Sequence, residues 1–218
     1  MTKTEKRARL REIVERLKEV YPTAACALEW GGDPWRLMVM GRLSAQCTDA
    51  RVNIVSRELF AAFPSAEALA EGDVSEIERI VKPCGLFRTK AASIKEASRM
   101  IVRDFGGRLP DNMDELLLLP GVGRKVANLL LGDVYGADVV VCDTHCMRIA
   151  GRLGMYSESL RDPDCIERIL KELMPKGEGS DFCHRIVEFG RQYCPARGYD
   201  CSRCPLAELC ERGRRENG

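Results

Sequence analysis

Signals for helix starts recur along almost the whole chain, and they restrict its fold more than any other feature. Pro34 directly follows Asp33, and Thr48 or Asp49 precedes the next run with apolar residues at helical spacing. Proline suits the first turn of a helix, and Asp, Ser and Thr side chains accept hydrogen bonds from its free N–H groups. The only strand-like run, 139–141, is too short and isolated to build a sheet. The sequence therefore predicts an all-α fold with short connections.

The expected helices follow these signals. Ser65 opens a short helix, and Ser75 with Glu78 reads as a capping box in front of the apolar segment 77–81. The other helices are expected over residues 4–20, 88–105, 114–119, 124–135, 144–153, 163–174 and 180–193, besides those that begin after Asp33 and after Thr48 or Asp49.

Composition and charge set broad limits on function. The 218 residues include 34 Lys and Arg against 33 Asp and Glu, so the net charge is about +1. Binding to a polyanion would therefore need a local concentration of positive charge. No apolar run is long enough to cross a membrane, and the charged N-terminal segment lacks the apolar core of a signal peptide. We therefore expect a cytoplasmic protein, nucleoid-associated in a prokaryote, with no membrane partner.

Four of the eleven cysteines are concentrated near the C-terminus, with the spacing Cys-x6-Cys-x2-Cys-x5-Cys. A loop this short cannot bury four separate thiols, whereas a shared cation would stabilise thiolates and fold the loop. Tetrahedral zinc and an iron–sulfur cluster both suit four sulfur ligands, and the compact layout favours the cluster. Four unligated cysteines are the third alternative. The residues concerned are Cys194, Cys201, Cys204 and Cys210.

A glycine turn interrupts the apolar segment "LLLLPGVGRKVANLLL" and leads into a helix that begins with two cations, Arg124 and Lys125. Glycines at such a turn leave main-chain N–H groups unshielded, and together with the helix start they can bind one phosphate. Tight packing between two helices is the alternative reason for a Gly-Val-Gly turn.

Lys125 and Asp143 are candidate reactive groups. Burial, the helix start and the neighbouring Arg124 would all lower the pKa of Lys125, and an uncharged amine is a nucleophile for Schiff-base chemistry. An exposed structural charge is the alternative. The apolar run 139–142 should be buried, and it delivers Asp143 to the start of the next helix. There Asp143 can cap the helix, and its carboxylate could also stabilise a developing positive charge.

Taken together, these motifs resemble the endonuclease III family of bifunctional DNA glycosylases in the helix-hairpin-helix superfamily. The resemblance rests on "LPGVGRK", on "DTH" beginning 18 residues after the lysine, and on the cysteine spacing. It also includes "LSAQCTDARVN", close to the family's LSAQ-x-TD-x-x-VN, and "GLFRTKA", close to GLY-x-x-KA, with Phe87 where tyrosine is common. It extends from about Tyr21 to Cys210.

The resemblance implies base excision repair of duplex DNA with oxidised pyrimidines or abasic sites, by a protein that we expect to be a monomer. Lys125 would attack C1′ of the damaged nucleotide, release the base and cut the strand by β-elimination from a Schiff base (AP lyase activity). Asp143 would stabilise the cationic sugar and assist proton transfer.

The same resemblance assigns the binding residues. A helix-hairpin-helix grips the DNA backbone, side chains fill the gap left by the extruded base, and the motif histidine binds DNA or gives hydrogen-bonding support. The four cysteines would hold a [4Fe–4S] cluster. The implied DNA-binding residues are Gln46, Leu86, Gly121, Val122, Gly123, Arg124 and His145.

Two helical lobes with a cleft between them are also implied by the family fold. A six-helix lobe with the helix-hairpin-helix would span residues 28–136, and the cluster lobe would combine residues 1–27 with 137–218.

Three other functions fit part of the pattern. A related adenine or mismatch glycosylase shares the scaffold but lacks a lysine at position 125. A non-catalytic DNA-binding or redox-signalling protein would use the hairpin and the cluster alone. A structural protein would hold zinc in the cysteine loop.

Overall fold

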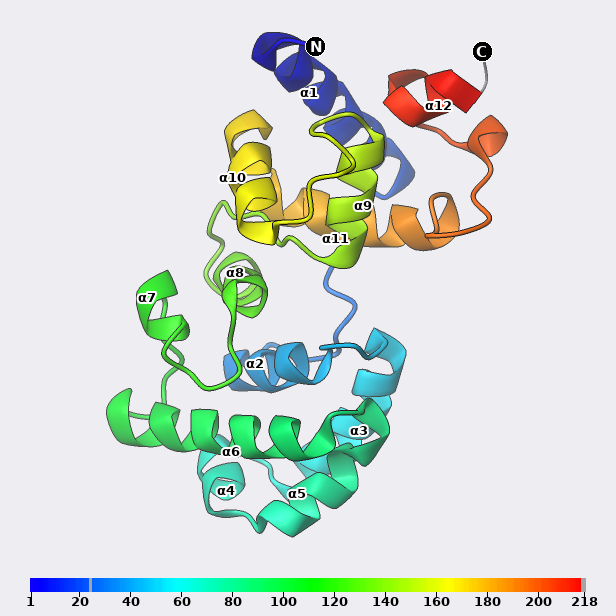
Figure 1. The fold of residues 1–218 in the computed structure, drawn as a ribbon. Helices are drawn as coiled ribbons and strands as arrows, with labels where there is room; N and C mark the ends of the chain where they lie inside the picture. The colour runs from blue at the N-terminus through cyan, green and yellow to red at the C-terminus, as the bar shows by residue number, and fades with distance from the viewer. Residues whose placement is uncertain (24, 217–218) are drawn as a thin grey trace. The chain divides into compact units, whose positions relative to one another are not determined.

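The computed structural model describes residues 1–23 and 25–216, in which all regular secondary structure is helical and no strand occurs. The all-α prediction is confirmed (Figure 1). The α-helices are α1 (Lys3–Val20), α2 (Pro34–Leu43), α3 (Asp49–Ala62), α4 (Ala66–Glu71), α5 (Val74–Val81), α6 (Phe87–Asp104), α7 (Met113–Leu116), α8 (Arg124–Asp133), α9 (Thr144–Arg152), α10 (Pro163–Leu173), α11 (Gly179–Gln192) and α12 (Glu211–Glu216). Short 3-10 helices are η1 (Lys82–Cys84), η2 (Cys201–Arg203) and η3 (Ala207–Leu209).

Side-chain caps fix most of the helix starts where the sequence predicts them. Asp33 accepts from the N–H groups of Trp35 and Arg36, and Thr48 accepts from that of Arg51. The capping box predicted at Ser75 is wrong, because Asp73 caps α5 and accepts from the N–H of Ser75 itself. The carboxylate two residues earlier satisfies that N–H, so the helix begins at Val74 and includes Ser75. The helix α12 was not predicted.

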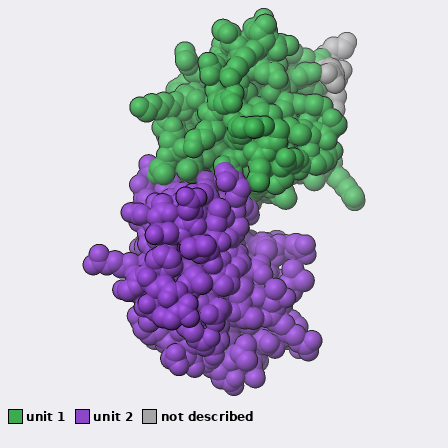
Figure 2. Space-filling model, turned by 60° about the vertical axis from the view of Figure 1, so that its left-hand side comes forward, with its two compact units in different colours: residues 1–25, 137–218 green, residues 26–136 purple. Residues whose placement is uncertain are grey.

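Two compact units make up the chain, and Figure 2 shows them in different colours. Residues 26–136 form one, and residues 1–25 with 137–218 form the other, of which 24 and 217–218 are not described. The predicted six-helix lobe, 28–136, lies within the first unit. There α2–α6 and α8 are the longer helices and α7 is a single turn, all within residues that the structure describes. The predicted division into two domains stays a prediction.

The unit 26–136 is built around α2, which is apolar on nearly every side and is therefore buried. Figure 1 shows it between α6 and α8. Trp35 Nε1 donates to Ser98 Oγ of α6 at 2.8 Å. On the other side, Gly41 allows α8 to approach closely, because a Cβ there would lie 3.1 Å from Val126 Cγ1. The helix that Leu86 precedes, α6, and the helix that carries Arg124 and Lys125, α8, are thus both fixed to one buried helix.

In the other unit, α11 is the packing partner of α1 and α9. The buried Arg185 of α11 donates to the carbonyl of Tyr21 after α1 at 3.0 Å and pairs with Asp181 at 3.0 Å. Apolar side chains on one face of α1 are buried: Leu10, Ile13, Val14 and Leu17. Across the described residues, no helix is both long enough and apolar enough to cross a membrane.

Candidate active site and nucleic-acid interface

The predicted glycine turn between α7 and α8 is anchored by two buried side chains, Leu119 and Val122. The Val122 N–H donates to the Leu119 carbonyl at 3.0 Å. Gly121 adopts a φ of +83°, which side chains resist, and a Cβ there would lie 2.5 Å from Arg42 Nε and 2.9 Å from Ser93 Cβ. Position 121 therefore requires glycine for its backbone conformation and for its contacts with α2 and α6.

The start of α8 concentrates positive charge. Gly123 is its N-cap in extended backbone, no side chain caps the helix, and its first turn contains no acidic residue. Arg124 and Lys125 are exposed there. Free N–H groups at a helix start carry partial positive charge, and two cations beside them make the site suited to an anion such as a phosphate.

Lys125 is exposed in this structure, so the expected burial of its side chain was wrong. The buried face of α8 comprises Ala127, Asn128, Leu130 and Leu131, and Lys125 lies outside it. Its amine is accessible to a ligand approaching the helix start. Lys125 belongs to the unit 26–136 and Asp143 to the other unit.

Gln46 and Leu86 share a rare backbone conformation. Their φ angles are +54° and +49°, and among the described residues they are the only non-glycine residues with positive φ. The left-handed region costs an L-residue about 1–2 kcal/mol. Both side chains are nevertheless exposed, Leu86 by 56%. Strained residues with exposed side chains are typical of functional positions, because burial does not compensate them.

Asp143 caps α9, as predicted, and its carboxylate accepts from the Cys146 N–H at 2.7 Å. The preceding run 139–142 is buried, also as predicted, and Val141 N–H donates to Cys183 Sγ at 3.2 Å. The buried run and the cap fix the backbone of Asp143 while its side chain stays partly accessible.

His145 packs against α11. A Cβ at Gly190 would lie 2.5 Å from His145 Nδ1, so glycine there makes room for the ring. Arg148 Nη2 lies 3.2 Å from the same nitrogen. These contacts suit the supporting role, and a DNA contact by His145 stays a prediction.

The four clustered cysteines line one cavity together with apolar side chains such as Phe189 and Leu206. None of the four is in a disulfide, and burial raises the pKa of Cys204 to about 11. Across the described residues, no three His, Cys, Asp or Glu side chains are grouped closely enough to hold one metal ion. The four sulfurs thus surround a shared space without converging on a single point.

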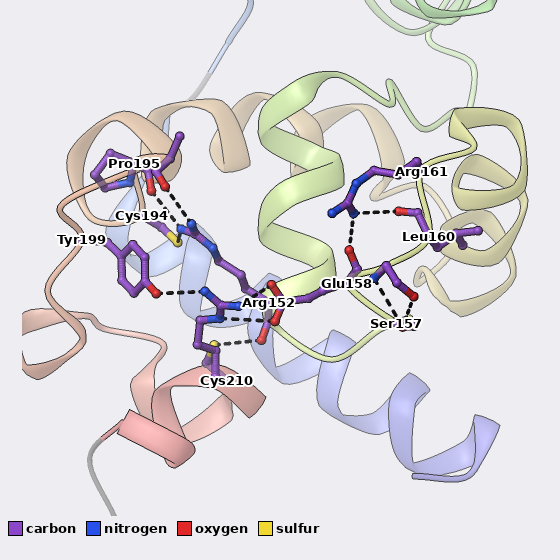
Figure 3. A network of polar contacts seen from close by, with 12 residues as sticks. Arg152, Ser157, Glu158, Leu160, Arg161, Cys194, Pro195, Tyr199 and Cys210 are labelled. Carbon is purple, nitrogen blue, oxygen red and sulfur yellow. Dashed lines mark hydrogen bonds and ion pairs between the residues drawn. The ribbon is translucent and has the colours of Figure 1, made fainter.

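Two arginines of α9 hold the cysteine loop, and neither was singled out from the sequence. Figure 3 shows one of them, Arg152, beside Cys194, Pro195 and Tyr199. The buried Arg152 donates to Cys194 Sγ at 3.1 Å and to the carbonyls of Pro195 and Ala196, and its guanidinium stacks 4.2 Å from the Tyr199 ring centre. Arg148 donates to the Cys194 carbonyl at 3.0 Å. Arg148 and Arg152 follow "DTH" and are four residues apart, so they lie on one face of the helix. This spacing was the sequence feature that could have identified them as a pair.

The helix α9 therefore has two roles in its unit. Its first residue follows the capping Asp143, and its last turn binds the loop that bears the cysteines. Cys210 closes the arrangement, because its thiol donates to the Arg152 carbonyl at 3.2 Å.

Comparisons with known proteins agree with this geometry. The family model for HhH-GPD superfamily base excision DNA repair proteins matches residues 39–176. Endonuclease III of Synechocystis sp. is 46% identical over 207 residues, which cover 94% of this chain and 93% of the relative. Endonuclease III of Bacillus subtilis is 37% identical over 206 residues, with coverage of 94% and 92%.

Solved structures give the same result. A trapped endonuclease III–DNA covalent intermediate superposes with a TM-score of 0.91 at 33% identity, covering 100% of both chains. A non-covalent endonuclease III–DNA complex has a TM-score of 0.91 at 34% identity and covers 100% of this chain and 99% of that one.

The turn geometry predicts different effects for its two exposed glycines. Gly121→Ala should lower the free energy of unfolding by about 2–3 kcal/mol, because the added Cβ meets Arg42 and Ser93 at a positive φ. Gly123→Ala is the control. A Cβ added at Gly123 would have no heavy atom beyond the neighbouring residues within 4 Å, and φ there is −98°. This substitution should lower the free energy of unfolding by at most about 1 kcal/mol. Urea unfolding of both variants measures the difference, and equal losses would contradict the packing argument.

Proposed function

The chain belongs to the endonuclease III family, within the HhH-GPD superfamily of base excision DNA repair proteins, and from this we propose how its residues act on damaged DNA. It is a DNA glycosylase with AP lyase activity, and we propose oxidised pyrimidines in duplex DNA as its substrates. The observation that carries the proposal is the exposed amine of Lys125 in the first turn of α8, directly after a turn suited to a phosphate.

Lys125 is the proposed nucleophile. Its Nζ lone pair forms a bond to C1′, the N-glycosidic bond breaks, and the base leaves with the bonding electrons and takes up a proton. The bound amine then gives up one proton, O4′ takes up a proton, and the C1′–O4′ bond breaks, so the sugar opens and a protonated Schiff base remains. Removal of a C2′ proton then expels the 3′ phosphate, which is the strand cut of an AP lyase.

Asp143 assists in this proposal as a fixed negative charge. The sugar gains positive charge as the base leaves, and a carboxylate held by the start of α9 stabilises that charge without having to reorganise. The same carboxylate can accept and return a proton during the conversion to the Schiff base.

Gly121 and Gly123 present main-chain N–H groups to the DNA backbone, and Arg124 adds a charge beside them. Val122 keeps the turn in shape, because its N–H is bonded to the Leu119 carbonyl within the turn. Phosphate contacts of this kind fix position without reading sequence. Gln46 and Leu86 fill the space that the damaged nucleotide leaves, which offsets the few kcal/mol required for extrusion. The proposed partner is therefore duplex DNA with a damaged base or an abasic site, bound by a monomer.

A [4Fe–4S] cluster is the proposed cofactor of the cysteine loop, held by Cys194, Cys201, Cys204 and Cys210. The four thiols line one cavity, so one bound group can reach all of them. Their compact Cys-x6-Cys-x2-Cys-x5-Cys spacing supports the cluster over zinc. When bound, the cluster cross-links the loop and provides a one-electron redox centre.

Borohydride trapping tests the nucleophile. Lys125→Gln should abolish the covalent complex with abasic DNA and still bind the duplex, because the amine is lost and the turn is kept. The matched control is Lys82→Gln, an exposed lysine in η1, which should trap like the wild type. Strand cleavage by Lys125→Gln at the wild-type rate would assign the reaction to another lysine.

Substrate class is tested with a panel of duplexes that each carry one lesion: an oxidised pyrimidine, uracil, 8-oxoguanine or an abasic site. We expect release of the oxidised pyrimidine and cleavage at the abasic site, with far slower reaction at uracil and 8-oxoguanine. Preferential release of another base would reject oxidised pyrimidines as the substrate class.

Replacing one cysteine ligand tests the cofactor. Cys204→Ser should lose most of the visible absorbance and iron, and should yield less folded protein, because ligand binding and folding of the loop are coupled. Cys165→Ser in α10, outside the quartet, should retain both. Iron content and the visible absorption spectrum of each variant are the measurements. A colourless wild-type protein that contains one zinc ion would contradict the proposed cluster.

A further inference from the structure

Lys90 is a completely buried cation at the centre of the unit 26–136, with 0% of its surface exposed. Its ammonium donates to three main-chain carbonyl oxygens, those of Leu43 at 2.8 Å, Ala45 at 2.7 Å and Cys84 at 2.8 Å. Two of them lie at the end of α2 and directly after it, and the third lies in η1 before α6. One side chain therefore ties together two segments that are about forty residues apart in sequence.

These two segments carry the two left-handed residues. The Ala45 carbonyl belongs to the peptide that supplies the nitrogen of Gln46, so holding this peptide plane restricts the φ of Gln46. Leu86 follows Cys84 by two residues, and its own carbonyl accepts from the main-chain N–H of Lys90 at 3.0 Å. Lys90 thus contacts the backbone beside both strained residues, through its ammonium and through its N–H.

The contacts continue to the glycine turn. Ser93, one helical turn after Lys90, donates from Oγ to the Lys90 carbonyl at 2.9 Å. Arg42 Nε donates to the same Ser93 Oγ at 2.9 Å, and Arg42 is the side chain that fills the space beside Gly121. The first turns of α6 therefore connect the segments of Gln46 and Leu86 to the turn of the proposed phosphate site.

A purely structural lysine is the alternative reading. Burial lowers the pKa of Lys90, since an ammonium loses hydration there, so its charge is retained only with good partners. An apolar side chain would fill the same space but would leave three carbonyls without their donor. The ammonium stabilises the backbone of two exposed turns, and neither turn buries the side chain at its tip, Gln46 or Leu86.

We propose that Lys90 is a positioning residue, which holds Gln46 and Leu86 as a preformed pair so that their side chains can enter the gap left by an extruded nucleotide. This inference rests on the proposed function. Preformed turns matter most when a stacked base must be extruded, because the inserted side chains then replace lost stacking. They matter less at an abasic site, where no base has to leave the stack.

The substitution Lys90→Met removes the ammonium and keeps an unbranched side chain. Release of an oxidised pyrimidine should fall by roughly tenfold or more, while strand cleavage at an abasic site should change by less than about threefold. The matched control is Lys95→Met on the same helix, because the half-buried Lys95 also donates to a carbonyl, that of Gly72, away from Gln46 and Leu86. Both reactions of Lys95→Met should stay near the wild-type rates.

Extrusion is measured separately from chemistry. Each substitution is combined with Lys125→Gln, and 2-aminopurine placed next to the lesion reports loss of stacking by its fluorescence. Lys90→Met should reduce the fluorescence rise at saturating protein, and Lys95→Met should not. A stability loss alone would lower the active fraction and scale both reactions equally, so the ratio between the two reactions distinguishes positioning from folding.

The outcomes separate the two hypotheses. Failure of the wild type to release a base or to cut abasic DNA would reject the proposed function. With an active wild type, equal losses in both reactions or an unchanged fluorescence rise would overturn the positioning role. If Lys90→Met does not fold, Lys90→Gln, which keeps two N–H donors, replaces it. The ratio of base release to abasic-site cleavage then tests the positioning role in that variant. If neither variant folds, Lys90 is a stability element and the positioning role is rejected.

Discussion

Helix starts are the constraint on which the candidate site depends. Main-chain groups inside a helix bond to each other, so the free N–H donors of each helix lie in its first turn. Lys125 lies in the first turn of α8, Asp143 caps α9, and Leu86 precedes α6 as its N-cap. The position near a helix start surrounds Lys125 with positive charge suited to an anion and gives Asp143 a fixed backbone. A helical protein can therefore build a reactive site without a sheet edge or a long loop.

Irregular segments between helices need other partners, and buried cations supply them in both units. Lys90 satisfies three carbonyls in the unit 26–136, and Arg152 satisfies two carbonyls and contacts a cysteine sulfur in the other unit. A charged donor forms stronger hydrogen bonds to carbonyls than a neutral one, and a long side chain reaches several of them. Burial of each cation is tolerated because the turns it binds would otherwise leave acceptors unpaired.

Local chemistry explains why so much of the fold was predictable. Helix starts at Asp33 and Thr48 follow from capping side chains within three residues, and the burial of 139–142 follows from its composition. The start of α5 was predicted wrongly because Asp73 and Ser75 offer competing caps, and only the backbone shows which one is used.

Contacts between distant residues were beyond such reasoning. The acceptors Leu43 and Ala45 of the Lys90 ammonium lie more than forty residues from it in sequence, as do the loop contacts of Arg152. Whether Lys125 is buried depends on which face of α8 packs against its neighbours. The motif letters identified positions for the site residues, but the side chains that hold those positions could be recognised only from the fold.

The left-handed turns at Gln46 and Leu86 show why strain persists at these positions. Glycine would adopt either backbone conformation at little cost, yet it has no side chain for the gap-filling role that we propose for these positions. A side chain at the tip of such a turn must accept the unfavourable φ, and the surroundings must compensate for it. The compensation comes from α6, where the carbonyl of Leu86 and the peptide before Gln46 are both bound by Lys90. The strain and the buried ammonium are thus linked. Exposed side chains at positive φ gain no stability from burial, so hydrogen bonds from Lys90 to the adjacent backbone compensate for the strain.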